Sequence, residues 1–523
     1  MQLLSAYGVD TVFGMPGVHT LEAYRGLEDA GIKHIGVRHQ QGAGFMADGY
    51  ARMTGKPGVC LLISGPGVTN AATPIGQAYS DSVPVLAITS VAATDDLGMG
   101  RGKLHDVTEQ SRVTEPLTTF SATALNPNQV HEYVARAFAS FETGRKRPVH
   151  ISLPLDVITA PDSKPAKARQ SFGRAMPVES DAVKMAEILA QAERPVFIVG
   201  GGARHASDEI LALAEAIGAA VVPTITGKGI VDDAHPLSVE STLDREATQT
   251  FICNADVVLA VGTELAEPDL WLDGPLPLTG RFLRIDIDRR TLALDYDPEI
   301  AMCADSAAAL QCVMSHLPES KTQGFHGTDD IQTLRAVERD KLAPLEKAHI
   351  PVIDAIRRAI PKEGVVYTDM TQLAYTACAV YPCHTSNTFH FPAGFGTLGY
   401  GIPAAIGGKI ASPDTPVAVF VGDGGFQFTL QELGTAVENE LPMAIILWDN
   451  NSLAQIRDGM ISRDIPTIGV NQFNPDFTAL AKAYGCHVEE PNDLPSVEVA
   501  VKAAFGRNRP TVIRLRESDF IKG

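Results

Sequence analysis

The chain has 523 residues, of which 45% are hydrophobic and 20% charged, as expected for a soluble globular protein of about three domains. Its formal net charge of −19 argues against nucleic acid or an anionic membrane as a partner. No apolar run reaches the roughly 18 residues needed to cross a bilayer. The seven cysteines are scattered and the first residues carry no basic signal segment, so we expect reduced thiols and a cytoplasmic location.

Short apolar runs alternate with helical patterns along the chain, which predicts parallel sheets covered by helices. We therefore expect three α/β domains, each with a doubly wound parallel sheet. The first occupies residues 1–158, a central Rossmann-like domain occupies 175–317, and the third occupies 345–523. A Pro/Ala/Lys-rich linker at 160–174 and a polar stretch at 318–328 separate them.

The first and third domains share an order of features. In the first, an apolar strand at 58–64 ends in a glycine-rich turn, and a helical pattern then leads to a second strand at 85–88. In the third, a strand at 417–421 ends in another glycine-rich turn, followed by a helical pattern and a strand at 443–447. Two interpretations stay open: all doubly wound sheets look alike, or the chain carries a pseudo-repeat of one nucleotide-binding-like fold.

Polar side chains follow the two strands of the third domain. Asp423 comes directly after the first strand, and Asn450 comes directly after the second. Strands joined through one helix are usually close neighbours, and open α/β sheets bind ligands at the carboxyl edge. A carboxylate and an amide oxygen suit a hard cation, and Gly422, Gly424 and Gly425 let backbone N–H groups approach an anion. Such a turn is weak support for function on its own.

The turn is one of several motifs that extend over essentially the whole chain. Together they resemble the thiamine-diphosphate-dependent enzymes of the acetolactate synthase and 2-oxo-acid decarboxylase superfamily. The segments that carry the resemblance are Phe13–Gly17, Arg38–Gln41, Ala47–Arg52, Ser64–Asn70, Asp81–Pro84, Gly394–Ala405, Gly422–Gly424 and Asp449–Asn451. The resemblance implies a pyrimidine-binding first domain, a central domain and a diphosphate-binding third domain.

The resemblance also implies a cofactor and a metal, thiamine diphosphate and Mg²⁺. The metal ligands would be Asp423, Asn450 and the backbone carbonyl of Ser452. The remaining cofactor contacts it implies are Pro16, Gln40, Pro66, Asn70, Thr371, Gly396, Leu398, Gly422, Gly424 and Gly425. Asp449 replaces the asparagine usual in the family, and we expect the metal site to stay intact.

Two of these contacts have specific implied roles. The Gly396 carbonyl would accept a hydrogen bond from the 4′-amino group of the cofactor, and Leu398 would hold the cofactor in its bent shape. A place in the core of a helix is the alternative interpretation of Leu398. In the family each site is completed by a second subunit, so a homodimer or homotetramer is expected.

The central domain lacks the segments with which acetolactate synthases hold FAD. The corresponding regions are 238–243 and 262–267, and neither resembles the flavin-binding motifs. The three glycines at 200–202 are a weak dinucleotide signal and more often form a tight turn between strand and helix. We therefore expect no FAD.

Three segments, at 10–22, 368–376 and 455–460, resemble the branch of the superfamily that decarboxylates 5-guanidino-2-oxopentanoate (2-ketoarginine). A guanidinium substrate would need a carboxylate in the pocket, and Asp449 and Asp458 are candidates, although a solvated loop acid is the plainer interpretation of each. One alternative function is a flavin-free carboligase that joins two 2-oxo acids. A second is a weakly active or non-catalytic paralogue.

The residue after His39 is the most informative departure from the family, because Gln40 stands where most members have a glutamate. That carboxylate activates the cofactor by sharing a proton with its aminopyrimidine ring, which an amide cannot do. Three interpretations stay open: a slipped register that makes Gln41 the counterpart, an engineered change, or a natural enzyme with slow or relayed activation. His39 and His105 are candidates for such a relay, or are structural histidines.

Overall fold

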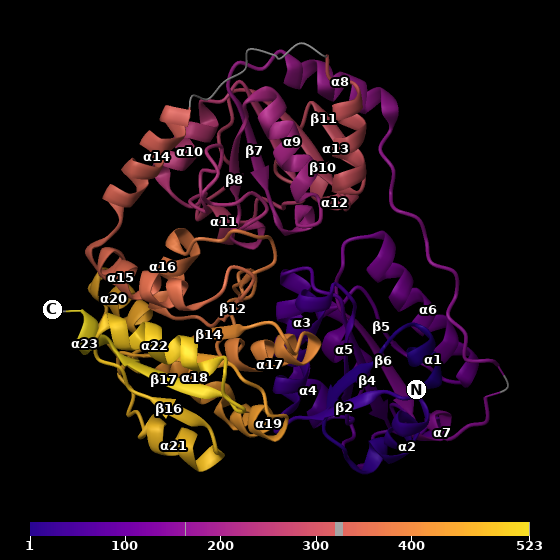
Figure 1. The fold of residues 1–523 in the computed structure, drawn as a ribbon. Coiled ribbons are helices and arrows are strands. Elements are labelled where there is room, and N and C mark those ends of the chain that lie inside the picture. The colour runs from indigo at the N-terminus through magenta and orange to yellow at the C-terminus, as the bar shows by residue number, and fades with distance from the viewer. Residues whose placement is uncertain (163, 319–327, 522–523) are drawn as a thin grey trace. The chain divides into compact units, whose positions relative to one another are not determined.

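The computed structural model describes residues 1–162, 164–318 and 328–521 (Figure 1). Most of the polar stretch predicted at 318–328 lies outside the described residues, as do the last two residues of the third predicted domain. Internal contacts divide the chain into two units. Unit 1 comprises Met1–Phe172, Tyr367–Gln372 and Gly394–Asp519, and unit 2 comprises Gly173–Val366, Leu373–Ala393 and Phe520–Gly523. The three domain boundaries stay a prediction.

Three parallel sheets confirm the predicted fold class. The first has the order β2 (Lys33–Gly36), β1 (Thr11–Gly14), β3 (Gly58–Leu62), β4 (Val85–Val91), β6 (Val149–Pro154), β5 (Ser121–Thr123). The second has the order β11 (Ile300–Cys303), β10 (Arg281–Asp286), β9 (Val257–Val261), β7 (Pro195–Val199), β8 (Ala220–Pro223). The third has the order β13 (Phe389–His390), β12 (Val365–Thr368), β14 (Val417–Gly422), β15 (Ala444–Asp449), β17 (Thr511–Arg516), β16 (His487–Glu489).

The first and third sheets have one topology. When the strands of each are numbered in chain order, both sheets have the order 2-1-3-4-6-5. The strands predicted at 58–64, 85–88, 417–421 and 443–447 are β3, β4, β14 and β15, and each pair is hydrogen-bonded in parallel. The shared order favours the pseudo-repeat over a general likeness of doubly wound sheets.

The helices fall between the strands, as the alternating pattern predicts. Those from the N-terminus to the linker are α1 (Gln2–Ala6), α2 (Leu21–Asp29), α3 (Gln40–Thr54), α4 (Pro66–Ser80), α5 (Gln110–Thr114), α6 (Pro127–Thr143) and α7 (Leu155–Ile158). The next are α8 (Glu179–Ala190), α9 (Ser207–Ile217), α10 (Glu246–Cys253), α11 (Glu267–Leu270), α12 (Arg289–Leu292), α13 (Ser306–Ser315), α14 (Thr328–Lys341), α15 (Pro344–Ala359) and α16 (Gln372–Val380). The last are α17 (Gly401–Ala411), α18 (Asp423–Thr429), α19 (Leu433–Glu438), α20 (Ala454–Ile461), α21 (Phe477–Tyr484), α22 (Leu494–Ala504) and α23 (Glu517–Phe520).

Within unit 1, α3 and α17 pack against each other at van der Waals distance. A Cβ placed on Gly49 would lie 1.9 Å from the Ala404 carbonyl oxygen, and a Cβ on Gly407 would lie 1.9 Å from the Met46 carbonyl oxygen. Tyr400 in turn donates a 2.8 Å hydrogen bond to Asp48. Glycine at these positions therefore lets the helices that flank the first and third sheets meet backbone to backbone.

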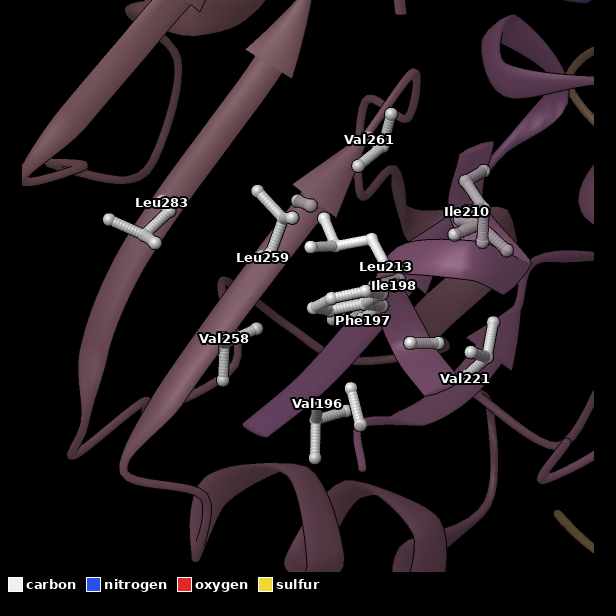
Figure 2. Packing of buried hydrophobic residues seen from close by; sticks show 14 of the residues in the cluster. Val196, Phe197, Ile198, Ile210, Leu213, Val221, Val258, Leu259, Val261 and Leu283 are labelled. Atoms are coloured by element: carbon white, nitrogen blue, oxygen red, sulfur yellow. The ribbon is translucent and has the colours of Figure 1, made fainter. Parts of the chain in front are cut away.

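Unit 2 has its own hydrophobic core around the second sheet. Figure 2 shows side chains of β7, β9 and α9 meeting there, among them Phe197, Leu259 and Leu213. The strands are apolar on both faces, as expected for a parallel sheet with helices on both sides. No helix within the described ranges combines the length and apolar character needed to cross a membrane. All seven cysteines are unpaired.

Candidate cofactor and metal site

The carboxyl edge of the third sheet carries Asp423, the first of the predicted metal ligands, beside Asp449. Strands β14 and β15 are neighbours with Gly422 opposite Trp448, so Asp423 and Asp449 lie side by side at the strand ends. The Asp423 carboxylate is buried, accepts a 2.9 Å hydrogen bond from the Gly424 N–H, and has a pKa raised chiefly by that burial. A buried carboxylate of this kind is stabilised in its charged form by a nearby cation.

Three side-chain oxygens converge on a single nitrogen at this edge. The Asn474 Nδ2 lies 2.7 Å from Asp423 Oδ2, 3.1 Å from Asp449 Oδ1 and 3.1 Å from Asn451 Oδ1. An amide nitrogen has two hydrogens, so three acceptors exceed what it can satisfy. The donor set is thus rich in oxygen and negative, which suits a hard cation.

No cluster of three or more His, Cys, Asp or Glu side chains within the described ranges could hold a metal. The predicted ligand set has another composition: one carboxylate, one amide oxygen and one backbone carbonyl. Asn450 donates through Nδ2 to Gln372 Oε1 at 3.4 Å and to Glu517 Oε2 at 3.3 Å. Its amide oxygen therefore points away from Gln372 and Glu517. The Ser452 hydroxyl donates to the Val470 carbonyl, and the role of the Ser452 carbonyl stays a prediction.

Asp449 is held by an arginine. The Arg514 guanidinium on β17 donates to Asp449 Oδ2 from Nε at 2.8 Å and from Nη2 at 2.5 Å, and the Asp449 side chain is 1% exposed. A buried carboxylate in this position needs such a partner. The pair accounts for an aspartate where the family has an asparagine, and it leaves Asp449 poorly placed to bind a substrate cation.

Asp458, the other candidate for the substrate cation, lies on α20 and is half-exposed. It accepts a 3.2 Å hydrogen bond from Gln372 Nε2, and Gln372 is the residue that also contacts Asn450. Arg457 donates a 2.9 Å hydrogen bond to the same carboxylate. Asp458 is therefore joined to the candidate metal ligand through one glutamine.

The glycine-rich turn at 422–425 is packed against the residues that follow β12. A Cβ on Gly425 would lie 2.3 Å from Asp369 Oδ1, and one on Gly422 would lie 3.0 Å from Thr371 Oγ1. Asp369 is fully buried, and burial raises its pKa to about 6. It accepts hydrogen bonds from the N–H groups of Gly399 and Gly401, so it links the turn to the loop at 394–400.

That loop carries Gly396 and Leu398. Gly396 has φ +63°, a conformation that favours glycine, and Leu398 is half-buried in the loop before α17. The interpretation of Leu398 as part of a helix core is therefore wrong. The loop is tied to α4 by Thr397, which donates to Gln77, and by the Gly394 N–H, which donates to Asp81.

Gln40 is the first residue of α3 and is buried. Its Oε1 accepts a 3.0 Å hydrogen bond from Asn70 Nδ2, which joins two of the predicted cofactor contacts. Gln41 is half-buried, and its N–H donates to His39 Nδ1. The contact with Asn70 favours Gln40, rather than Gln41, as the counterpart of the family glutamate.

His39 is the N-cap residue of α3, which is a structural role. The buried Glu432 supports the same helix end: its Oε1 accepts from the N–H groups of Arg38 and His39, and burial raises its pKa. Of the remaining predicted residues, Pro16 and Pro66 are exposed at the carboxyl edge of the first sheet. The backbone of His105 packs against Gly65, beside Pro66.

Several residues of the site were not found from the sequence. They are His19, Asp369, Gln372, Glu432, Asn474 and Arg514. Each bonds to a residue more than 25 positions away or to a loop with no regular pattern, so no local spacing marks it. The only available signal was a polar residue next to a family motif.

At the carboxyl edge of the second sheet, the turns after β7 and β9 pack backbone against backbone. A Cβ on Gly200 would lie 2.4 Å from the Gly262 carbonyl oxygen, and Gly202 donates a 3.0 Å hydrogen bond to the same oxygen. These glycines therefore serve tight packing between two turns, as the sequence indicated for residues 200–202.

Taken together, two α/β sheets of one topology and an oxygen-rich carboxyl edge are typical of an enzyme that binds a phosphate-bearing cofactor. Three family profiles match the chain: "Thiamine pyrophosphate enzyme, N-terminal TPP binding domain" at residues 1–113, the central domain of the same family at 182–313, and its C-terminal TPP binding domain at 369–515. The chain belongs to the thiamine pyrophosphate enzyme family.

Relatives cover nearly the whole chain. A Pseudomonas aeruginosa protein named "Probable 2-ketoarginine decarboxylase AruI" is 47% identical over 99% of this chain and 93% of its own length. The large subunits of Escherichia coli acetolactate synthase isozymes 1 and 3 are 29% and 31% identical. The alignment with isozyme 1 covers 99% of this chain and 92% of the relative, and that with isozyme 3 covers 94% and 89%.

Proposed function

We propose that this protein is a thiamine-diphosphate- and Mg²⁺-dependent decarboxylase of a 2-oxo acid. The observation that carries the proposal is the 47% identity, over nearly the full length of both chains, to a protein named as a 2-ketoarginine decarboxylase. The reaction would convert R–CO–COO⁻ and a proton into R–CHO and carbon dioxide. When bound, the cofactor supplies the electron sink that accepts the electron pair left behind as the carboxylate departs.

The residues at the third sheet fit the cofactor and its metal. Asp423, the Asn450 oxygen and the Ser452 carbonyl would hold Mg²⁺, and Asn474 would orient Asp423. The turn at 422–425, with Thr371 beside it, would face the diphosphate. The convergence of three oxygens on the Asn474 nitrogen supports the assignment.

At the first sheet, Gln40 would meet the aminopyrimidine ring. Because Gln40 Oε1 accepts from Asn70, its Nε2 is the atom that remains to donate to the ring nitrogen N1′. A donor at this position favours the ring nitrogen without a proton, whereas a carboxylate would share one. Activation of the cofactor would then be slow or would depend on other groups. Both a natural glutamine and an engineered one stay open.

The proposed substrate is 5-guanidino-2-oxopentanoate, which would give 4-guanidinobutanal. The support is the name of the Pseudomonas relative and the half-exposed Asp458 carboxylate, which Gln372 joins to the proposed metal ligand Asn450. A planar guanidinium pairs well with a carboxylate. Each aspartate has an arginine partner, but Asp449 is also buried and accepts two hydrogen bonds from Arg514, whereas Asp458 accepts one from Arg457, so Asp449 is less suitable.

A second candidate function is a flavin-free carboligase that joins two 2-oxo acids, and the identity to acetolactate synthases favours it. In either case we expect no FAD, because residues 238–243 and 262–267 do not resemble flavin-binding motifs. Stoichiometric flavin in gently purified protein would contradict it. If neither an aldehyde nor acetolactate forms, the protein is a weakly active paralogue.

We expect a cytoplasmic homodimer or homotetramer with sites completed by a partner. Large apolar side chains are exposed on unit 1, which a second subunit would bury: Val18, Leu21, Met99, Leu104, Phe428, Ile456, Ile461, Ile468 and Phe473. Light scattering of the purified protein should therefore give at least twice the mass of one chain.

The experiment that tests the function is mass spectrometry of the products formed from a panel of 2-oxo acids. The purified protein is supplied with thiamine diphosphate and Mg²⁺, and the matched control is Asp423→Ala. We expect an aldehyde one carbon shorter than the substrate, with no product from the variant. Acetolactate from pyruvate would favour the carboligase, and product without added or bound thiamine diphosphate would refute both.

A further inference from the structure

A cavity of about 480 Å³ lies in unit 1 at the amino edge of the first sheet. It is lined by Thr11, the first residue of β1, by Pro57 just before β3, and by Pro84 just before β4. The candidate cofactor residues Pro16 and Pro66 follow the other ends of β1 and β3, and these strands are parallel. The cavity is therefore at the edge opposite the candidate cofactor site. Its size is within the range of small-molecule sites, about 300–1,000 Å³.

Aromatic side chains form much of the cavity wall. The rings of Tyr7 and Phe138 stack with centroids 4.3 Å apart and an interplanar angle of 24°, and Phe141 meets Phe138 edge-on with centroids 6.0 Å apart. Phe172, at the end of the linker, also lines the cavity and is 62% exposed. A flat ring bound here would cover aromatic surface that is in contact with water, which favours an aromatic ligand.

The linker is fastened to the rest of unit 1 on both sides of this aromatic wall. The Tyr7 hydroxyl accepts a 3.1 Å hydrogen bond from the Arg169 N–H. Glu142 Oε2, on α6, accepts a 3.1 Å hydrogen bond from the Phe172 N–H. These bonds hold the backbone that carries Phe172, so its exposed ring is part of a formed site.

One carboxylate in the cavity lining has a fixed orientation and a free oxygen. Asp10 Oδ1 accepts a 2.6 Å hydrogen bond from the Tyr50 hydroxyl and a 2.8 Å hydrogen bond from Thr11 Oγ1. Asp10 Oδ2 makes no hydrogen bond with any residue that the structure describes. The tyrosine thus orients the carboxylate, and Oδ2 can accept a charge-assisted hydrogen bond from a ligand ammonium group.

The charged side chains of the lining balance one another. Asp10 and Glu142 are acidic, and Lys56 and Lys146 are basic. The Lys146 ammonium donates to the Gly55 carbonyl at 3.5 Å, whereas the Lys56 ammonium has no partner within the described ranges. A nucleotide, with its excess of negative charge, would be repelled by the two carboxylates. A zwitterion would instead find a partner for each of its charges.

We propose that this cavity binds an aromatic α-amino acid. The ring of the ligand packs against the aromatic wall that includes Phe172, its ammonium group donates to Asp10 Oδ2, and its carboxylate pairs with Lys56. Binding is reversible and changes no covalent bond. The site is separate from the candidate cofactor site, so the inference does not depend on which 2-oxo acid the protein converts.

The test is isothermal titration calorimetry of the purified full chain with L-tryptophan and two analogues. Tryptamine lacks the carboxylate and indole-3-propionate lacks the ammonium group. We expect one tryptophan to bind per chain, and each analogue to bind more weakly by about threefold or more, because each loses one charged contact. Saturating thiamine diphosphate with Mg²⁺ should not compete with tryptophan.

Two variants assign the charged groups of the ligand to their partners. Asp10→Asn still accepts from Tyr50 and Thr11, so the fold should be kept, but tryptophan and tryptamine should bind about tenfold or more weakly while indole-3-propionate is unaffected. Lys56→Met should weaken tryptophan and indole-3-propionate by about threefold or more and leave tryptamine unaffected. The matched control is Asp29→Asn, an exposed aspartate at the end of α2 that does not line the cavity, and it should change none of the three affinities.

Three results would overturn the inference. The first is no saturable binding of L-tryptophan, L-tyrosine or L-phenylalanine at millimolar concentration, whether or not adenosine monophosphate binds instead. The second is an equal affinity for tryptophan in the unchanged protein, Asp10→Asn and Lys56→Met, because the ligand would then bind elsewhere. The third is competition between tryptophan and thiamine diphosphate, which would move the ligand to the candidate cofactor site.

Discussion

At the scale of single residues, Asp449 shows how a departure from a family pattern is accommodated. Its carboxylate is buried between Arg514 and the Asn474 amide that also contacts Asp423. A charge in this position is tolerated because the guanidinium on β17 neutralises it. The aspartate and the arginine therefore act as one unit behind the candidate metal site.

Arg514→Met should leave the Asp449 charge buried without a partner and displace the residues around Asp423. Breaking such a pair costs about 3–5 kcal/mol, so we expect a lower melting temperature and weaker Mg²⁺-dependent binding of thiamine diphosphate. The double variant Arg514→Met with Asp449→Asn removes the buried charge as well. It should recover most of the melting temperature and most of the cofactor binding. Calorimetry and cofactor titration measure the two effects, and a double variant no better than Arg514→Met would contradict the pairing.

Gln40→Glu should speed the activation of the cofactor. A carboxylate can share a proton with the ring nitrogen, whereas the amide can only donate to it. We expect faster exchange of the cofactor C2 proton, measured by proton NMR in deuterated water, with cofactor affinity changed by less than about threefold. Equal exchange rates in the two proteins would show that position 40 does not perform the glutamate role here.

Sequence reasoning reached part of the site at this scale. It named Asp423, Asn450 and Gln40 because each stands in a short motif whose chemistry is known. It did not reach Asn474 or Arg514, because these residues meet the motif only through the fold. A polar contact across neighbouring strands has no fixed spacing along the chain, so the pattern carries no signal for it.

At the scale of elements, the contact between α3 and α17 brings the two motif-bearing helices of unit 1 together. Gly407→Ala would place a Cβ 1.9 Å from the Met46 carbonyl, which neither helix backbone can avoid without moving apart. We expect a loss of about 1–3 kcal/mol or more, seen as a lower melting temperature. The matched control is Gly459→Ala on α20, where a Cβ meets nothing within 4 Å. Alanine at position 459 should stabilise the folded protein by roughly 0.5–1 kcal/mol. Equal changes in melting temperature for Gly407→Ala and Gly459→Ala would contradict the close contact between α3 and α17.

The elements themselves were largely predictable. The four strands expected at 58–64, 85–88, 417–421 and 443–447 are β3, β4, β14 and β15, because buried parallel strands are continuous apolar runs bounded by glycine or proline. The loop at 394–400 could not be predicted in the same way. Its path depends on Asp369, which follows β12, and on Gln77 and Asp81 in α4 and at its end.

At the scale of the whole molecule, buried histidines should make the protein sensitive to acid. Burial lowers the pKa of His150 to about 4, whereas the unfolded chain has an ordinary histidine pKa near 6.5. Between these values the unfolded state binds more protons, so the free energy of unfolding rises with pH from about 4 to 6.5 and is lost as pH falls. Protonation of His150 therefore lowers the free energy of unfolding by roughly 3 kcal/mol at most.

Thermal unfolding of the protein and of His150→Gln over this pH range tests that expectation. The glutamine keeps a donor and an acceptor for Thr89 and Thr114, which bond to the two ring nitrogens at 2.8 Å and 2.6 Å; Ser121 and Ser152 also bond to the ring. The melting temperature of the unchanged protein should fall further between pH 6.5 and 4 than that of the variant. Parallel curves would mean that the ring is not neutral in the folded state.

The shared order of the first and third sheets was one of two open interpretations of the sequence. Similar strands and turns indicate similar local structure, but only the pairing of strands distinguishes a repeat from a common architecture. The order 2-1-3-4-6-5 in both sheets supports the repeat. The number of subunits stays a prediction. The exposed apolar side chains are expected at a subunit interface, but they do not determine how many subunits assemble.

The most direct test of the central claim compares two specificity constants for the protein with thiamine diphosphate and Mg²⁺. We predict that kcat/KM for conversion of 5-guanidino-2-oxopentanoate into the aldehyde exceeds kcat/KM for pyruvate by at least about tenfold, or about 1.4 kcal/mol of transition-state binding. A higher value for pyruvate, with acetolactate as the product, would contradict the account.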